Sequence, residues 1–232
     1  MYKKETISFF LPVRKGNERV NDKNIRPFGR FSGGLLEKKL LQLRDCLVFD
    51  EIILSTNDFR AIDIANRLQI PRLKILHRPD YLCQSSTKLS DLIRYVPTVT
   101  EADHILWGHV TTPFVDKNDY EEAVKTYFIQ RNNGYDSLVG GSRFQNFLLD
   151  GNGKTINNST PQKWPRTQDL IPLFEINHSI FITSRQVYLE QADRIGNKPY
   201  FYQMGKLQSL DIDWEDDFTL CELICTAMVS RK

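Results

Sequence analysis

The sequence predicts an α/β protein in which helices cover both faces of a mostly parallel mixed sheet. Short runs of β-forming residues alternate along the chain with amphipathic segments of helical length, which is the pattern of strand–helix–strand units. The first run leads straight into a loop that holds glycine and several cations, as at the carboxyl edge of an open α/β sheet. A length of 232 residues suits a single domain over 1–232 and would be cramped for two.

The predicted strands are short apolar runs bounded by turn residues. Residues 7–13 (ISFFLPV) give the clearest case, because the run is apolar throughout, as in a strand buried on both faces. Further strands are predicted at residues 49–55, 73–77, 104–109, 176–183 and about 200–204. Strands that are separated by helices usually pair in parallel, so most of the sheet is expected to be parallel.

The predicted helices are recognised by the spacing of apolar residues and by capping residues. After Gly33-Gly34, leucines recur at helical spacing as far as Leu47. Asn57 or Asp58 is a predicted N-cap, and so is Asp116. Helices are expected at residues 35–47, from the cap at 57 or 58 to before Pro71, and at 86–96, 116–130, 185–192 and 214–229.

Residues 140–175 break this alternation. Glycine, asparagine and proline are frequent there, and Asp150-Gly151 followed by Asn152-Gly153 predicts a hairpin turn. A segment of this length without regular structure is uncommon in a compact domain unless it has a function. We therefore expect a lid or an arm that reaches another subunit.

Composition argues against several classes of partner. A net charge of +2 gives no reason to expect a nucleic acid or a membrane surface. No apolar run approaches the roughly 20 residues of a membrane span, and the opening MYKKET is too short for a targeting segment. The four cysteines show no zinc-binding spacing. These features favour a reducing cytoplasm.

The loop after the first predicted strand is the first candidate site. It holds Arg14, Lys15, Gly16, Arg19 and Lys23. Arginine pairs with phosphate oxygens in a bidentate manner and lysine supplies a mobile point charge, so the loop suits a polyphosphate. A solvated basic loop is the alternative that composition leaves open. The loop is not a Walker A motif, because it contains no GxxxxGK[ST].

A pair of aspartates near the C-terminus is the second candidate site. Within a strand, Asp211 and Asp213 would face the same side, about 7 Å apart. Mg²⁺ selects carboxylate oxygens and usually takes one or two from the protein, with the rest from phosphate and water. Alternatively, Asp213 is the N-cap of the last helix, whose first turn is acidic.

The histidines show no metal-binding spacing. His77, His104 and His178 are therefore expected to be structural. His109 stands at the end of a predicted strand, where it is placed to contact a ligand, and the sequence favours neither a ligand-binding role nor a structural one.

Both candidate sites carry motifs of a known family. The run V-R-K-G-N-E-R-V-N-D-K-N resembles, without a gap, the A-R-x-G-S-K-R-x-x-x-K-N signature of the acylneuraminate cytidylyltransferases, which activate acidic sugars such as sialic acid. The run D-I-D-W-E-D-D-F resembles the D-[IV]-D-x-x-x-D-[FL] ending of that family. Shorter matches lie between them in the same order: Arg78-Pro79, Thr111 to Pro113, Pro165-Arg166 with Gln168, and Asn177 in N-H-S-I-F-I, against N-G-A-I-Y-I in the family.

The resemblance implies a three-layer, Rossmann-like nucleotide-diphospho-sugar transferase fold. It implies transfer of CMP from CTP to a sialic-acid-like 2-keto-3-deoxy sugar acid, with release of pyrophosphate, dependence on Mg²⁺, and a homodimer whose hairpin arm is residues 140–175. Catalysis would depend on Arg14, Lys23 and Asp211, and Asp211 with Asp213 would hold the metal. The implied nucleotide-binding residues are Arg14, Gly16, Arg19, Lys23, Asn24, Arg78, Ser85 and Thr111. The implied acceptor-binding residues are His109, Arg166, Glu175 and Asn177.

Departures from the family pattern concentrate on the acceptor side. Glu18 stands where a cation is usual, and His109 replaces a glutamine. Val115 and Glu175 each replace an arginine, and a glutamate would repel an anionic acceptor. The motifs that bind the nucleotide in the family are therefore retained in this sequence, whereas the motifs on the acceptor side differ from the family pattern. Two alternatives stay open: a glycosyltransferase, which would also combine a D-x-D pair with Mg²⁺, and a relative that binds nucleotide without catalysis.

Overall fold

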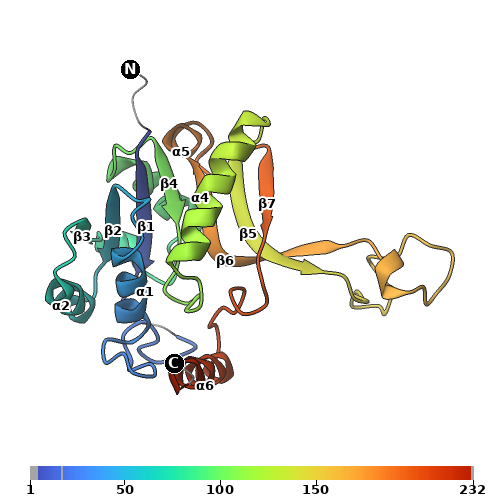
Figure 1. The fold of residues 1–232 in the computed structure, drawn as a ribbon, viewed down its shortest axis with the longest axis horizontal. Coiled ribbons are helices and arrows are strands. Elements are labelled where there is room, and N and C mark those ends of the chain that lie inside the picture. Colours follow the sequence, from blue (N-terminus) through green and yellow to red (C-terminus); the bar gives the residue numbers. More distant parts are fainter. Residues whose placement is uncertain (1–4, 17, 231–232) are drawn as a thin grey trace.

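Seven strands form one sheet in the computed structural model, which describes residues 5–16 and 18–230. Their order is β3-β2-β1-β4-β6-β5-β7, and β6 runs antiparallel to both of its neighbours (Figure 1). The strands are β1 (Ile7–Val13), β2 (Glu51–Thr56), β3 (Leu73–His77), β4 (His104–Trp107), β5 (Ser137–Phe144), β6 (Leu173–Ser184) and β7 (Pro199–Gln203). The prediction of a mostly parallel mixed sheet is confirmed.

Six α-helices and three short 3₁₀ turns are described. The helices are α1 (Gly34–Arg44), α2 (Phe59–Leu68), α3 (Leu89–Tyr95), α4 (Lys117–Asn132), α5 (Arg185–Gln191) and α6 (Glu215–Ser230). The 3₁₀ turns are η1 (Asp80–Leu82), η2 (Val96–Thr98) and η3 (Thr167–Asp169). None of these helices is both long enough and apolar enough to cross a membrane.

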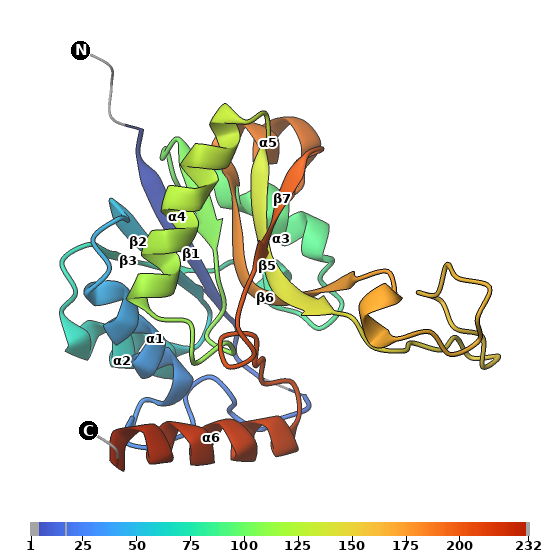
Figure 2. The ribbon, with the colours of Figure 1, turned by 45° about the vertical axis from the view of Figure 1, so that its right-hand side comes forward.

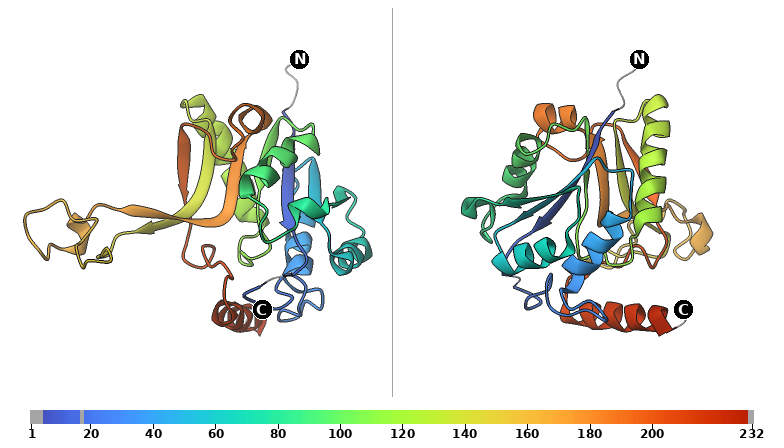
Figure 3. Two further views of the ribbon diagram at one scale, coloured as in Figure 1. Left: turned by 180° about the vertical axis from the view of Figure 1, so that it is seen from behind. Right: turned by 60° about the vertical axis from the view of Figure 1, so that its left-hand side comes forward.

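Helices cover both faces of the sheet because β1 is apolar on both sides. Phe9 points into one layer and Phe10 into the other, as the two-residue period of a strand requires. Phe9 packs edge to face on Tyr120 of α4, with ring centroids 5.1 Å apart, and Phe10 packs on Trp107 at 5.0 Å. Helices α1 and α4 lie on one face, and α3 and α5 on the other (Figures 1 and 3).

The loop after β1 lies under the carboxyl edge of the sheet, between the sheet and α6 (Figure 2). Arg60 of α2 fixes this loop through a bidentate ion pair with Asp22, at 2.7 and 2.9 Å. The segment before α6 is joined to the turn after β4, since the amide of Ile212 donates to the carbonyl of Thr111 at 3.0 Å. Segments from both ends of the chain therefore meet at this edge.

Several element boundaries differ from the prediction. Residues 140–144 and 173–175, expected to be irregular, belong to β5 and β6. A Cβ on Gly141 would lie only 2.3 Å from the backbone oxygen of Glu175, so the close approach of β5 to β6 requires glycine there. Glycine has a low strand propensity, which is why β5 was not predicted. In addition, α1 ends at Arg44, and Leu47 is 79% exposed rather than packed on a helical face.

A long projection leaves the sheet between β5 and β6 (Figure 1). Its predicted turn is formed, because the amide of Asp150 donates to the carbonyl of Lys154 and the amide of Gly153 donates to the carbonyl of Asp150, at 2.9 and 3.0 Å. Large apolar side chains stay exposed along it: Leu149, Ile156, Trp164, Ile171, Phe174 and Ile176.

A buried lysine of α1 holds the turn after β4. The Nζ of Lys39 donates to the carbonyl oxygens of Thr112 and Val115, both at 2.9 Å. It also donates to the Tyr120 hydroxyl at 2.9 Å.

We expect Lys39→Met to lower the free energy of unfolding in urea by about 2–3 kcal/mol, because three buried acceptors lose their donor. Lys38→Met is the control, because the Nζ of Lys38 lies near the rings of Phe31 and Phe114, at 5.5 and 6.0 Å from their centroids, and makes no hydrogen bond to a described residue. An equal loss there would contradict this explanation.

Candidate active site

A cavity of about 320 Å³ lies at the carboxyl edge of the sheet. Its walls come from the end of β1 and the loop after it, the start of α3, the turn after β4, β6, the segment between α5 and β7, and the segment before α6. The predicted site residues that line it are Arg14, Lys23, Asn24, His109, Thr111, Asp211 and Asp213. The structure thus brings the basic loop and the aspartate pair into one site, as the sequence predicted.

Lys23 is buried at the floor of this site. Its Nζ donates to the carbonyl of Ile212 at 2.6 Å and lies 3.7 Å from Oδ1 of Asp213. Burial lowers the pKa of Lys23, and the carboxylates of Asp213 and Asp211 oppose that shift. A cation that is already desolvated and fixed in this way needs little reorganisation when a phosphate binds.

Asp213 pairs with cations and does not cap the last helix. Its Oδ1 accepts from Arg19 at 2.7 Å, and both side chains are about half exposed. The amides of Asp213 and Trp214 are instead satisfied by the carboxylate of Asp217, at 3.0 and 2.8 Å. Because α6 begins at Glu215, its cap position is Trp214, so the alternative that Asp213 is the N-cap is wrong. The Asp213 side chain instead lines the cavity.

Asp211 is the less exposed member of the pair, with 18% of its side chain exposed against 44% for Asp213. The segment 211–213 is not a strand, so the same-face geometry of a strand does not apply, but Ile212 is buried and both aspartates line the cavity. Burial raises the pKa of Asp211, and the nearby Thr111 hydroxyl opposes that shift. Oδ1 of Asp211 is buried without a hydrogen-bond partner among the described residues.

His109 is held in one tautomer at the cavity wall. Its Nε2 accepts a hydrogen bond from Nε1 of Trp107 at 3.1 Å, so the proton is on Nδ1, which donates to the carbonyl of His178 at 2.7 Å. Burial lowers the pKa of His109 to about 3, so the ring is neutral at physiological pH. His109 would therefore contact a ligand as an uncharged ring.

His178 also lines the cavity, although the sequence led us to expect a structural role. Its Nδ1 lies 3.3 Å from Oδ2 of Asp211, and its backbone adopts a left-handed φ of 54°. Glycine adopts this conformation most readily, and the resembling family has glycine at this position in N-G-A-I-Y-I. The replacement of that glycine was the one sequence signal that could have identified His178.

Two residues expected to bind the nucleotide are engaged elsewhere. The Arg78 guanidinium is buried and donates to the hydroxyl and carbonyl of Ser55, with Nε 3.1 Å from Oγ. The Ser85 hydroxyl donates to the carboxylate of Glu18. Neither Arg78 nor Ser85 lines the cavity.

Three residues of the basic loop shape it in different ways. Asn24 fastens the loop, since its Nδ2 donates to the carbonyl of Arg14 at 3.3 Å. Gly16 is exposed and has a φ of 74°, which glycine adopts without strain. Arg19 reaches the site only through its ion pair with Asp213.

A second cavity of about 400 Å³ adjoins the first and holds predicted acceptor-binding residues. Glu175 and Asn177 line it, together with His178, Asp211 and Asp213. Asn177 is buried, and its Nδ2 donates to the hydroxyl of Ser209 at 3.0 Å.

Arg166 lies elsewhere. This residue is part of the projection, where it pairs with Asp169 at 3.0 Å and its side chain is 77% exposed. A single chain therefore does not bring Arg166 to its own site.

Arg194 is a cavity residue that the sequence did not reveal. It lies between α5 and β7, outside every recognised motif, and it lines the first cavity with Lys23 and Asp211. No local pattern marked it, because its surroundings come from strands distant in the sequence.

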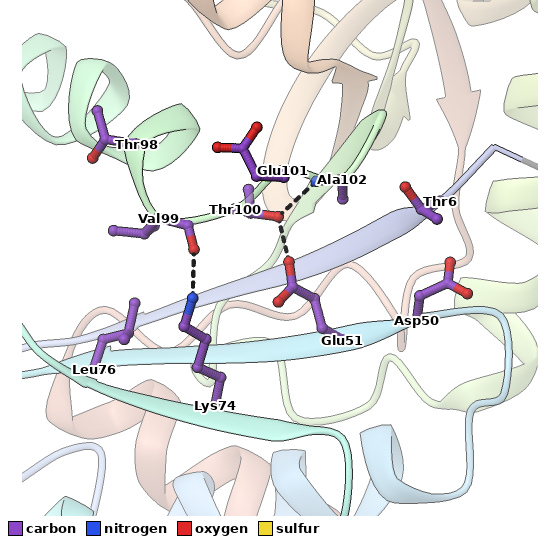
Figure 4. Close-up of a pocket in the computed structure, with 10 residues that line it drawn as sticks. All are labelled: Thr6, Asp50, Glu51, Lys74, Leu76, Thr98, Val99, Thr100, Glu101 and Ala102. Carbon is purple, nitrogen blue, oxygen red and sulfur yellow. Dashed lines mark hydrogen bonds between the residues drawn. The ribbon is translucent and has the colours of Figure 1, made fainter.

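A larger cavity, of about 700 Å³, lies at the opposite, amino edge of the sheet (Figure 4). Its polar groups satisfy one another: the Thr100 hydroxyl donates to the carboxylate of Glu51, and Nζ of Lys74 donates to the carbonyl of Val99 at 3.0 Å. Ligands of open α/β sheets bind at the carboxyl ends of the strands. The candidate active site is therefore the smaller cavity.

A mostly parallel sheet whose carboxyl edge gathers cations and carboxylates defines a nucleotide-binding α/β protein of the Rossmann-like class. Within that class, the chain belongs to the cytidylyltransferase family, whose pattern it matches over residues 9–228. The resemblance seen in the motifs is thereby confirmed.

Two curated relatives illustrate the similarity. The chain is 24% identical over 226 residues to the N-acylneuraminate cytidylyltransferase of Streptococcus agalactiae serotype III (strain NEM316), covering 90% of this chain and 50% of that protein. It is 23% identical over 222 residues to the pseudaminic acid cytidylyltransferase of Campylobacter jejuni subsp. jejuni serotype O:23/36 (strain 81-176), covering 92% and 94%. The chain thus spans about half the length of the first relative and nearly all of the second.

Solved structures share the fold. The structure of CMP:2-keto-3-deoxy-manno-octonic acid synthetase complexed with CTP has a TM-score of 0.63 and 12% identity, covering 98% of this chain and 99% of that one. The 4-diphosphocytidyl-2C-methyl-D-erythritol synthase of Anaerococcus prevotii DSM 20548 has a TM-score of 0.65 and 10% identity, covering 95% and 98%. The predicted Rossmann-like fold class is confirmed.

Proposed function

We propose that the protein transfers CMP from CTP to an acidic sugar of the sialic-acid-like 2-keto-3-deoxy class, releasing pyrophosphate in a Mg²⁺-dependent reaction. The observation that carries the proposal is the convergence of Arg14, Lys23 and Asp211 on one cavity at the carboxyl edge. Relatives named as cytidylyltransferases for N-acylneuraminate and pseudaminic acid support the acceptor class. A structural neighbour described as complexed with CTP supports the nucleotide.

The cations of the cavity bind the triphosphate. Arg14 and Lys23 hold phosphate oxygens and stabilise the charge that grows on the departing pyrophosphate. Arg19 is paired with Asp213 at 2.7 Å, so it exchanges that carboxylate for a phosphate when the nucleotide enters. In the reaction the acceptor oxygen forms a bond to the α-phosphorus, and the bond from that phosphorus to the oxygen that bridges the α- and β-phosphates breaks. Pyrophosphate leaves, and the proton of the acceptor hydroxyl passes to water. Such transfer depends on positioning and charge, without a covalent nucleophile.

The aspartate pair fits Mg²⁺. Both residues offer carboxylate oxygens, and the buried Oδ1 of Asp211 lacks a hydrogen-bond partner among the described residues. No group of three or more His, Cys, Asp or Glu side chains in the described part of the chain is arranged to hold a metal. Asp211 and Asp213 would therefore supply the protein ligands of the ion, and phosphate and water oxygens would supply the others. When bound, the ion would neutralise phosphate charge and lower the pKa of the acceptor hydroxyl.

A pyrophosphate-release screen tests this function. The four ribonucleoside triphosphates are combined with 2-keto-3-deoxy sugar acids, with and without Mg²⁺, and we expect release with CTP and an acidic sugar only. Transfer from a nucleotide-sugar donor without pyrophosphate would support a glycosyltransferase instead. Nucleotide binding without pyrophosphate release across the whole panel would mean that this chain binds nucleotide without catalysis.

The projection is the proposed dimerisation arm, which brings Arg166 to the acceptor side of the partner's cavity. Its exposed apolar side chains support this, because clusters of this kind usually mark an interface. We expect a dimer in sedimentation velocity at about 10 μM, and Trp164→Asp should weaken it at least about tenfold, since buried tryptophans dominate interfaces. Leu189→Asp, at an equally apolar exposed position on α5, should leave the dimer intact. A wild-type protein that is monomeric in this experiment would contradict the proposal that the projection is a dimerisation arm.

A further inference from the structure

Arg194 is placed to bind an anion in the active-site cavity. Its guanidinium lies over the rings of Phe181 and Trp107, at 3.8 and 4.9 Å from their centroids. The residue is only 8% exposed, yet it lines the cavity that Lys23 and Asp211 share. Two aromatic rings therefore fix the plane of a cation whose side chain lines the cavity.

The guanidinium has no hydrogen-bond partner within the described part of the chain, and its Nη1 is fully buried. The nearest carboxylate along the chain, that of Asp193, accepts instead from the amides of Arg194 and Ile195, at 2.6 and 3.1 Å. Arg78 shows the contrast, because it is as deeply buried but donates to Ser55. Burying a guanidinium without a hydrogen-bond partner costs free energy. We therefore expect a ligand to supply the missing hydrogen-bond acceptor of Arg194.

The charges around the two cavities indicate which ligand that is. Asp211 and Asp213 line both cavities. The second cavity adds the carboxylate of Glu175 and, among the described residues, no lysine or arginine, so an anion is not favoured on that side. The first cavity adds the cations Arg14, Lys23 and Arg194. Arg14 and Lys23 are needed for the triphosphate, which leaves Arg194 for the other anion of the reaction, the acceptor.

We propose that Arg194 binds the carboxylate of the acidic acceptor and so determines the specificity of the enzyme for it. The inference rests on the proposed function, because the acceptor is one of its two substrates. A planar guanidinium matches a carboxylate in a bidentate manner, and the pair is strengthened by exclusion of water. Arg194 thereby supplies the positive charge that Val115 and Glu175 do not supply on the acceptor side.

The test compares Arg194→Met, which keeps the volume and the aromatic packing, with the wild type. We expect kcat/KM for the acidic acceptor to fall about 100-fold, while the Kd of CTP measured by calorimetry changes less than about twofold. An acceptor whose carboxylate is replaced by a carboxamide should be disfavoured about 100-fold by the wild type and hardly at all by the variant. Arg194→Lys should recover only part of the activity, since lysine lacks the planar fork.

Three outcomes would overturn the inference. Loss of CTP affinity equal to the loss for the acceptor would show that Arg194 binds phosphate. Unchanged acceptor kinetics with a lowered melting temperature would show a purely structural residue. The absence of any acceptor binding to the wild type in calorimetry would leave Arg194 without a ligand. By contrast, acceptor binding that depends on Arg194 but gives no pyrophosphate release would overturn only the proposed function.

Discussion

Lys23→Ala should lower kcat/KM for CTP by about 10²–10³-fold, or about 3–4 kcal/mol of transition-state stabilisation. The Nζ of Lys23 is buried and fixed 2.6 Å from the carbonyl of Ile212, so its charge is preorganised toward the cavity. Lys23 is only 8% exposed, so little water surrounds this cation, and burial lowers its pKa. An added phosphate therefore interacts with it in a medium of low polarity, where charge stabilisation is strong. Pyrophosphate release under steady-state conditions measures the effect.

Lys15→Ala is the matched control for this variant. Lys15 belongs to the same loop but is exposed and does not line the cavity, so its loss should change kcat/KM less than about threefold. Thermal unfolding of both variants separates lost chemistry from lost structure, because Lys23 also ties the loop to the segment before α6. Full turnover by a folded Lys23→Ala protein would show that the loop is not the phosphate site.

The location of the site could be predicted because it depends on order along the chain. Arg14 and Lys23 follow the first strand, and the carboxyl ends of parallel strands share one edge, so their placement follows from topology. The capping box of α4 could also be predicted, since Asp116 and Asp119 make both of its hydrogen bonds within four residues. The order of elements along the chain and a short capping motif can both be read from the sequence, and the tertiary structure retains both.

The direction in which individual side chains point could not be predicted. Arg78 has the expected place in the sequence, but its guanidinium turns into the protein toward Ser55. The environment of Arg194 depends on Trp107 and Phe181, which are brought together only by the pairing of β4 with β6. β5 was missed for a related reason, since its glycines serve a close approach to β6 that only the assembled sheet reveals.

Asp211→Asn should make the ligand-free protein more stable at neutral pH, by about 1 kcal/mol, because the wild type leaves a buried carboxylate oxygen without a hydrogen-bond partner in the described structure. Burial raises the pKa of Asp211 above its unfolded value, so the folded state binds the extra proton between the two pKa values. The contribution of Asp211 to stability is therefore full below the unfolded pKa and is lost as pH rises through the folded one. In urea denaturation from pH 3 to 8, the free energy of unfolding of the variant should rise relative to that of the wild type between the two pKa values.

The same substitution should abolish Mg²⁺-dependent turnover, by about 10³-fold or about 4 kcal/mol, since an amide is a poor ligand where a carboxylate is needed. Mg²⁺ with CTP should raise the melting temperature of the wild type and leave that of Asp211→Asn almost unchanged. Asp216→Asn is the control, because Asp216 is exposed on α6 and outside both cavities. A variant at Asp211 that is less stable than the wild type would mean that the carboxylate supports the fold. A gain in stability together with a loss of turnover would mean that the protein keeps this destabilising group for its function.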